Sequence, residues 1–164
     1  MGMKQILVMM AAVVLVGCGV KEESKASIGE NESKTSKPHA LITQYGRYQG
    51  GYPAGAPVSH IEKTKIIPCK IGESFGIDVS FRNSFGASVV AKVDHPPIKQ
   101  PDGELTTSSE LINERIIADD FDILLTFHFI KGYEYELKTG DWKFTVFIDG
   151  KEVAKEDFKI VPVN

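Results

Sequence analysis

The sequence is poor in the residues on which most catalytic and metal sites depend. It has two cysteines and four histidines, and none of them form an H-x-H, H-E-x-x-H or C-x-x-C spacing. Such spacings place ligands together around a metal ion. The sequence also lacks the G-x-S-x-G nucleophile elbow and the phosphate-binding G-x-x-x-x-G-K-[ST] loop. We therefore expect a protein that is not an enzyme and needs no cofactor.

Arginine is scarce as well. The three arginines, Arg47, Arg82 and Arg115, are scattered, and the formal net charge is −3. Proteins that bind nucleic acids concentrate basic residues on one face. We therefore expect no nucleic-acid partner.

Long apolar runs are missing too. The longest one, Ile6 to Val16, is shorter than the roughly 20 residues that span a bilayer. It follows Lys4 and precedes Gly17, a layout typical of a secretory signal. The next residue is Cys18, so an ordinary cleaved signal peptide with an incidental cysteine is one interpretation.

The other interpretation rests on the residues Leu15-Val16-Gly17-Cys18, which resemble the lipobox of bacterial lipoproteins. The resemblance implies cleavage before Cys18, attachment of fatty acyl chains such as palmitate, and anchoring to a membrane of the cell envelope. Gly19 follows in place of an aspartate. In a Gram-negative host this favours the outer membrane, with the protein facing the periplasm.

Composition divides the chain into three parts. Residues 1–17 are the predicted signal peptide, and residues 18–39 are the lipidated cysteine and a tether. Val20 to Pro38 is nearly all Lys, Glu, Ser, Thr and Asn. Such a segment buries too little apolar surface to offset its ordering entropy, so we expect it to be flexible. Residues 40–164 are long enough for one β-sandwich domain.

Two stretches show the alternation of a half-buried strand, Gly72–Arg82 and Trp142–Ile148. Successive side chains of a strand point to opposite faces. The expected buried faces consist of Phe75, Ile77, Val79 and Phe81 in the first stretch, and of Trp142, Phe144, Val146 and Ile148 in the second.

The second stretch leads into a hairpin. Asp149-Gly150 suits a type I′ turn, because both residues tolerate positive φ angles. On the return strand, Val153 and Phe158 are an odd number of residues apart. If both are buried, a β-bulge must absorb one residue between Ala154 and Asp157.

The remaining segments complete an all-β pattern. Leu41–Tyr48 is a plausible first strand, and Val58–Ile67 has the polar middle of an edge strand. Ala87–Asp94 follows a turn at Asn83–Gly86, and we expect it to pair antiparallel with Gly72–Arg82. His95–Gly103 contains three prolines, which cannot donate hydrogen bonds in a central strand. We interpret it as a crossover between sheets.

Two later segments are less uniform. Glu110–Asp120 fits either a short helix or a strand, and its strand neighbours favour the strand. Phe121–Ile130 has apolar residues on both faces, which predicts a central strand. Seven or eight short strands separated by turn signals favour an immunoglobulin-like antiparallel β-sandwich.

Several of these residues together resemble a bacterial domain family of uncharacterised function, found in exported proteins. The resemblance spans Leu41 to Val161. It implies the fold and the exported compartment, and it brings no catalytic residues. The residues that carry it are Tyr45-Gly46, Phe75-Gly76, Pro96-Pro97 and the segment from Gly132 to Ile160.

A few residues remain candidates for a site. Distant loops could bring His60, Cys69 and His95 together as a soft metal site, since imidazole and thiolate suit copper or zinc. Cys69, left without an intramolecular partner, is either buried and inert or available for an intermolecular bond. Its apolar neighbours favour partial burial. His128 alternates with apolar residues and fits an ordinary strand histidine.

Other candidates concern calcium and protein contacts. Asp119, Asp120 and Asp122 could bind calcium or form a solvated loop, and the missing EF-hand spacing favours the loop. Aromatic residues in exposed positions could form a contact surface. The alternative is that they pack on the protein itself. These residues are Tyr45, Tyr48, Tyr52 and Phe147.

Three functional hypotheses follow. The first is a membrane-anchored lipoprotein whose β-sandwich is a non-enzymatic binding or accessory domain with a protein partner in the cell envelope. The second is an inhibitor or chaperone of exported enzymes, acting through loops or strand edges. The third is a metal carrier that uses His60, Cys69 and His95.

Overall fold

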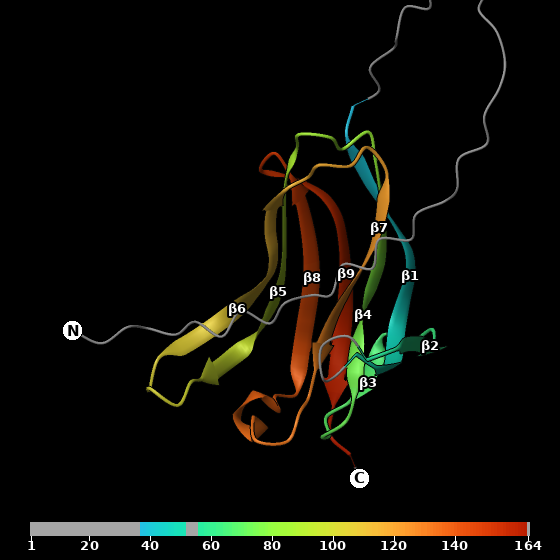
Figure 1. The fold of residues 1–164 in the computed structure, drawn as a ribbon. Coiled ribbons are helices and arrows are strands. Elements are labelled where there is room, and N and C mark those ends of the chain that lie inside the picture. Colours follow the sequence, from blue (N-terminus) through green and yellow to red (C-terminus); the bar gives the residue numbers. More distant parts are fainter. Residues whose placement is uncertain (1–36, 52–55, 164) are drawn as a thin grey trace, which may run out of the picture.

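The computed structural model describes residues 37–51 and 56–163. The predicted signal peptide, Cys18, most of the tether and Tyr52 lie outside the described residues. The described chain forms nine strands and one short 3-10 helix, η1 (Figure 1). The strands are β1 (His39–Gly50), β2 (Val58–Glu62), β3 (Ile66–Pro68), β4 (Ser74–Arg82), β5 (Ser88–Lys99), β6 (Leu105–Arg115), β7 (Phe121–His128), β8 (Gly140–Ile148) and β9 (Lys151–Val161); η1 is Glu134–Glu136.

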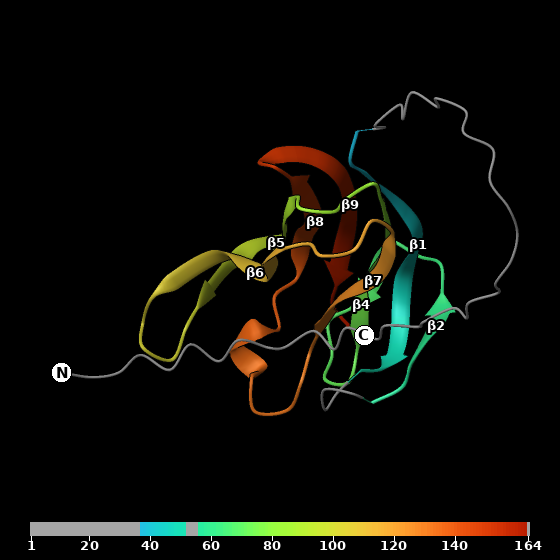
Figure 2. The same ribbon diagram turned by 45° about the horizontal axis from the view of Figure 1, so that its top comes forward.

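The strands form two sheets packed face to face (Figures 1 and 2). The four-stranded sheet has the order β2-β1-β4-β7, and the five-stranded sheet has the order β3-β9-β8-β5-β6. This confirms the predicted all-β sandwich. One pair departs from the antiparallel expectation, because β3 runs parallel to β9. The strand count is higher than predicted, since Val58–Ile67 divides into β2 and β3, which belong to different sheets.

The core lies between the sheets and consists of the two predicted faces. From β4, Phe75, Ile77, Val79 and Phe81 are all 0% exposed. From β8, the side chains of Trp142, Phe144, Val146 and Ile148 are at most 4% exposed. The alternation in the sequence therefore identified the inward residues of the strand at the centre of each sheet.

Phe75 makes the densest set of aromatic contacts in this core. Its ring centroid lies 5.7 Å from that of Trp142 and 5.8 Å from that of Phe144, both on β8. It also lies 5.3 Å from the ring of Phe158 on β9. The three pairs are edge-to-face, an arrangement that the ring quadrupoles favour. One side chain of the four-stranded sheet thus packs against three aromatic side chains of the five-stranded sheet.

The β8–β9 hairpin forms as predicted at Asp149 and Gly150, whose φ angles are 49° and 75°. The bulge is real, but its predicted position was wrong. Ala154 pairs with Val146 and Glu152 pairs with Phe147, so Val153 is the extra residue. Ala154, Glu156 and Phe158 pair in regular alternation with Val146, Phe144 and Trp142, so no extra residue lies between Ala154 and Asp157. Glu156 faces inward opposite Phe144 and forms an ion pair with Lys65.

The predicted pairing of Ala87–Asp94 with Gly72–Arg82 was wrong. β4 pairs with β1 and β7, and β5 pairs with β6 and β8. The turn at Asn83–Gly86 therefore carries the chain from one sheet to the other. Alternation specifies which face of a strand is buried, but a strand on either sheet can present that face to the same core.

The interpretation of His95–Gly103 as a crossover was also wrong. β5 continues through Pro96 and Pro97 to Lys99 and returns as β6 in the same sheet. The prolines are tolerated because β5 pairs with β8 only as far as Asp94. The register with β6 is also irregular between Asp94 and Ile98. Sheets accept proline at such irregularities.

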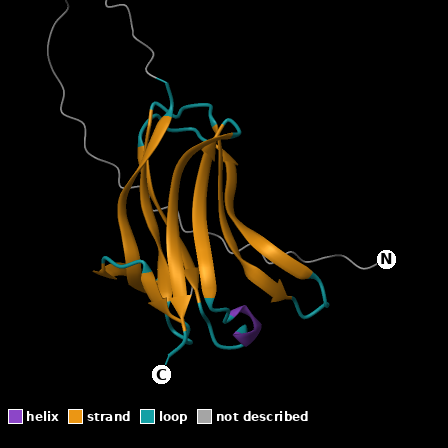
Figure 3. Ribbon diagram, turned by 180° about the vertical axis from the view of Figure 1, so that it is seen from behind, coloured by secondary structure: helices purple, strands orange, loops and turns teal. Residues whose placement is uncertain are grey.

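The place of β7 in its sheet and the end of β6 also differ from the predictions. β7 is the last strand of its sheet, not a central strand. The segment Glu110–Asp120 is a strand, as favoured, only up to Arg115. Within the described ranges, η1 is the single helix (Figure 3), and no helix there has the length and apolar character needed to cross a membrane.

Candidate functional site

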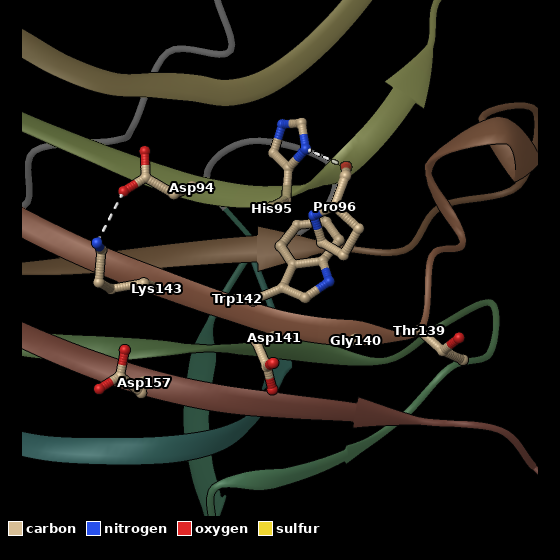
Figure 4. A pocket seen from close by; sticks show the side chains of 9 residues that line it. All are labelled: Asp94, His95, Pro96, Thr139, Gly140, Asp141, Trp142, Lys143 and Asp157. Carbon is tan, nitrogen blue, oxygen red and sulfur yellow. Dashed lines mark hydrogen bonds and ion pairs between the residues drawn. The ribbon is translucent and has the colours of Figure 1, made fainter.

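A shallow depression of about 600 Å³ lies on the described part of the chain where β5, β8 and β9 are neighbours (Figure 4). It is open to solvent over most of its area and mixes charged, polar and ring-bearing residues. Its lining consists of Asp94, His95, Pro96, Thr139, Gly140, Asp141, Trp142, Lys143 and Asp157.

His95 is the most chemically versatile residue of this depression, but it is only 6% exposed. Its Nδ1 lies 2.9 Å from the carbonyl oxygen of Pro96 and must donate to it, while Nε2 lies 3.3 Å from the Ser109 hydroxyl. The ring also packs 5.1 Å from that of Trp142. Both nitrogens are therefore engaged, and His95 is placed as a structural residue.

Two of the three carboxylates that line the depression are paired with lysines. Asp94 lies 3.2 Å from Lys92 and 3.3 Å from Lys143, the second contact being visible in Figure 4. Asp141 lies 2.7 Å from Lys159. Exposed ion pairs of this kind contribute little stability. Positive and negative side chains alternate across this surface. The depression therefore has no strong electrostatic field that would attract a ligand of one charge.

A second polar group lies on the outer face of the four-stranded sheet. His128 on β7 contacts the Ser74 hydroxyl at 2.6 Å through Nδ1 and the Thr126 hydroxyl at 2.9 Å through Nε2. Burial lowers the pKa of His128, which favours the neutral ring. A Ser–His contact suggests a nucleophile, but Ser74 is only 6% exposed. It is placed to satisfy the histidine rather than to meet a substrate.

Tyr48, Asp78 and His60 form a third group next to it. The Tyr48 hydroxyl donates to Asp78 Oδ2 at 3.1 Å, and the Tyr48 ring packs edge-on to His60. Burial is the main cause that raises the pKa of Tyr48. Burial also raises the pKa of Asp78, opposed by the hydrogen bond from Tyr48. His60 Nε2 donates to the Tyr45 carbonyl at 3.0 Å.

The predicted contact residues are more covered than expected. Tyr48 is 3% exposed and packs on the protein itself, which is the alternative given for these aromatic residues. Tyr45 is half-buried, with the ammonium groups of Lys63 and Lys65 each 5.2 Å from its ring centre.

Phe147 is also half-buried, and Lys92 lies 5.7 Å from its ring centre. Thr145 on the same face is only 2% exposed. Long lysine side chains commonly cover neighbouring surface with their apolar stems. The outer face of the five-stranded sheet is therefore less open than its sequence suggested.

The structure does not gather His60, Cys69 and His95. His60 lies on β2, Cys69 directly follows β3, and His95 lies on β5. The described residues contain no group of three or more His, Cys, Asp or Glu side chains that could hold a metal ion. Cys69 is a half-buried free thiol, as favoured, and burial raises its pKa.

The acidic segment after β6 is tied into loop structure. Asp120 accepts a hydrogen bond from the backbone N–H of Asn83 at 3.0 Å. Asp122 accepts one from the Ser80 hydroxyl and lies 3.4 Å from Arg82. Asp119 and Asp120 belong to the loop between β6 and β7, and Asp122 belongs to β7. The contacts of Asp120 and Asp122 with protein groups favour the loop interpretation of this segment over a calcium site.

The sequence did not predict the ionic group formed by Arg47, Glu62 and Glu73. Arg47 binds the buried carboxylate of Glu73 through Nε at 2.5 Å and Nη2 at 3.2 Å, and Glu62 through Nη1 at 2.7 Å. Glu73 is 4% exposed, so the arginine neutralises a charge that would otherwise be costly to bury. Nothing in the sequence links these three residues, which strand pairing alone brings together.

Most of the described chain matches one known protein family. Residues 42–160 match a family described as a domain of unknown function (DUF3859). The chain belongs to the DUF3859 family. This agrees with the resemblance to an uncharacterised domain family. A search of curated protein sequences finds no match for the DUF3859 chain.

Two solved structures are similar to the DUF3859 chain. One is an immunoglobulin-like protein from Pseudomonas aeruginosa, with 17% identity and a TM-score of 0.63, over 79% of this chain and 100% of that chain. It supports the immunoglobulin-like fold. The other is a Pseudomonas fluorescens alkylpurine DNA glycosylase bound to DNA containing an abasic site analog, with 14% identity. Its TM-score is 0.38, over 58% of this chain and 27% of that chain, and this similarity is too low to bear on fold or function.

A half-buried carboxylate on η1 makes the stability of the DUF3859 domain depend on pH. Burial raises the pKa of Glu136 from 4.5 to about 7. The folded protein then holds this proton more tightly than the unfolded chain does. The resulting stability is present below pH 4.5 and is lost as the pH rises through about 7.

Glu136→Gln removes this titration while keeping the shape. The full pKa shift corresponds to about 3 kcal/mol, which solvent screening of a half-exposed group reduces to about 1 kcal/mol. In urea unfolding, we expect the variant to be more stable than the wild type by about 1 kcal/mol at pH 8 and equal to it at pH 4. Glu134→Gln on the same helix is the control, since a backbone hydrogen bond from Gly132 lowers the pKa of Glu134. A gain for Glu136→Gln that is the same at both pH values would contradict the assignment.

Proposed function

We propose that this protein is a bacterial lipoprotein, anchored through acylated Cys18, whose immunoglobulin-like DUF3859 domain is a non-enzymatic binding or accessory module of the cell envelope. The observation that carries the proposal is the sequence Leu15-Val16-Gly17-Cys18 directly after an apolar run. In a Gram-negative host the anchor is in the outer membrane and the domain faces the periplasm.

The non-enzymatic role is supported by the state of the histidines. A general base needs a nitrogen that can reach a substrate proton. His95 and His128 each have both nitrogens in contact with protein oxygens, and His60 uses Nε2 on a backbone carbonyl. Membership of a domain family of unknown function and an immunoglobulin-like neighbour agree with this role.

Cys18→Ser tests the anchor directly. We expect the variant to lose labelling by radioactive palmitate and to move from the salt-washed membrane fraction to the soluble fraction. Cys69→Ser is the matched control, because it removes the other cysteine and should leave labelling and fractionation unchanged. Retention of Cys18→Ser in the washed membrane would refute the anchor.

A second candidate function, inhibition or chaperoning of exported enzymes, is favoured by the free edge of β6. Within residues 37–51 and 56–163, this strand is the last of its sheet and pairs only with β5. The segment from Leu105 to Glu110 precedes a bulge at Leu111 and contains neither proline nor lysine. Unprotected edges of this kind can accept an extended segment from another protein.

Added lysines on this edge test the second candidate. Leu105→Lys with Thr107→Lys should weaken inhibition of an exported protease at least tenfold, because charged side chains disfavour strand addition. Ser59→Lys with Ile61→Lys makes the same charge change on the edge strand β2 and should have no effect. Equal inhibition by both variants, or no inhibition of any protease by the wild-type protein, would eliminate this function.

A further inference from the structure

One end of the sandwich carries the two most exposed large hydrophobic side chains of the described chain. Phe85 is 68% exposed and Ile117 is 88% exposed. Phe85 lies in the β4–β5 loop and Ile117 in the β6–β7 loop. We refer to the loops 83–86 and 116–120 together with the β8–β9 turn at 149–150 as the upper pole, since they lie together at the top of Figure 1.

Hydrogen bonds hold the loops of the upper pole against one another. The Gly86 N–H donates to the Ile116 carbonyl at 2.8 Å, and the Ser84 N–H donates to the Asp119 carbonyl at 2.8 Å. The Asp149 N–H of the β8–β9 turn donates to the Ser88 carbonyl at 2.8 Å. The pole is therefore a fixed surface and not a set of independent loops.

This fixed surface presents its apolar tips outward. Ser84 and Ile116, one residue before each tip, are buried at 0% and 8% exposure. Each loop thus anchors one residue in the domain and directs the next into solvent. Because Gly86 and Ile116 are directly hydrogen-bonded, the two tips belong to neighbouring parts of the same surface. Apolar groups gathered in this way typically mark a surface that contacts a partner or a membrane.

The chain enters the domain at the same pole. β1 begins at His39, which pairs with Arg82 immediately before the β4–β5 loop. Everything that precedes β1, including Cys18, is therefore connected to the domain here. Figure 2, in which the top of the molecule comes forward, shows the start of β1 beside the loop that follows β4.

We infer that the upper pole docks onto the bilayer, with Phe85 and Ile117 inserted among the lipids at the membrane surface. The inference rests on the proposed lipid anchor at Cys18. An anchor joined to this pole holds it close to the bilayer, so docking becomes an intramolecular event with a high effective concentration. Two apolar side chains would bind a membrane only weakly from solution. On the anchored protein they are sufficient to dock the upper pole onto the bilayer.

The charges of the pole indicate which lipids it needs. Asp119, Asp120 and Asp149 are exposed, alongside Arg115. Such a mixture gives no net attraction to anionic headgroups. Phe85 and Ile117 therefore supply the affinity for the bilayer, and a membrane of zwitterionic lipids is sufficient for docking.

Tryptophan placed at the tip reports this docking. The lipidated full chain is reconstituted in phosphatidylcholine vesicles, part of whose lipids carry bromine on the acyl chains. Ile117→Trp is compared with Leu105→Trp, a site 66% exposed on the β5–β6 hairpin at the far end of the sandwich. Neither substitution touches the core, and the native Trp142 is 1% exposed and gives both variants the same background.

We expect the Ile117→Trp emission to shift to the blue and to be quenched by brominated lipid at least twofold more than that of Leu105→Trp. Adding Phe85→Ser to Ile117→Trp should reduce the quenching. If the protein floats with the vesicles and the two tryptophans are quenched equally, the anchor is present and the docking is refuted. If the protein does not float with the vesicles, the proposed anchor fails, and the docking that rests on it fails with it.

Discussion

Contact between Phe75 and the aromatic rings of the opposite sheet is the interaction on which the rest of the structure depends. Phe75 is fully buried near the start of β4, and its ring meets those of Trp142, Phe144 and Phe158 edge-to-face. No disulfide joins the two sheets of the described chain, whose single cysteine is a free thiol. The sandwich is therefore held by apolar burial and ring packing between its layers.

This core determines where the protein can act. The histidines next to the core already make hydrogen bonds within the protein. His95 contacts Pro96 and Ser109, and His128 contacts Ser74 and Thr126. What remains available are the ends and the edges of the sheets. The upper pole presents Phe85 and Ile117 on the side where the chain enters, and the β6 edge lies free along one flank. The proposed anchor and docking would direct one end of the domain toward the membrane and leave its other surfaces open to partners.

Local patterns in the sequence were sufficient for the buried faces of two strands and for the hairpin turn, because each depends on residues close together in the chain. The alternation in β4 and β8 identified their buried faces, and Asp149-Gly150 identified the turn. Pairing between distant strands was not accessible in this way. The sequence pattern of β5 fits either sheet, so its pairing with β8 in place of β4 could not be predicted.

The candidate site was harder to predict for the same reason. The burial of Tyr48 depends on Asp78 and His60, which come from β4 and β2. Glu156 faces inward opposite Phe144 and forms an ion pair with Lys65, and the pairing of β9 with β8 puts the extra residue at Val153. The prolines of β5 were compatible with a strand because the pairing is interrupted where they lie. In each case a contact distant in sequence overrode a local preference.

A double-mutant cycle between Phe75 and Trp142 tests most directly that ring contact between the layers holds the sandwich together. Unfolding in urea, followed by circular dichroism, gives the free energies for Phe75→Leu, Trp142→Leu and the double variant, and each substitution removes one of the two rings. If the rings stabilise each other, the double variant should lose less than the two single losses added together, with a coupling energy of about 0.5–1.5 kcal/mol. Losses that add to within about 0.3 kcal/mol would contradict the account.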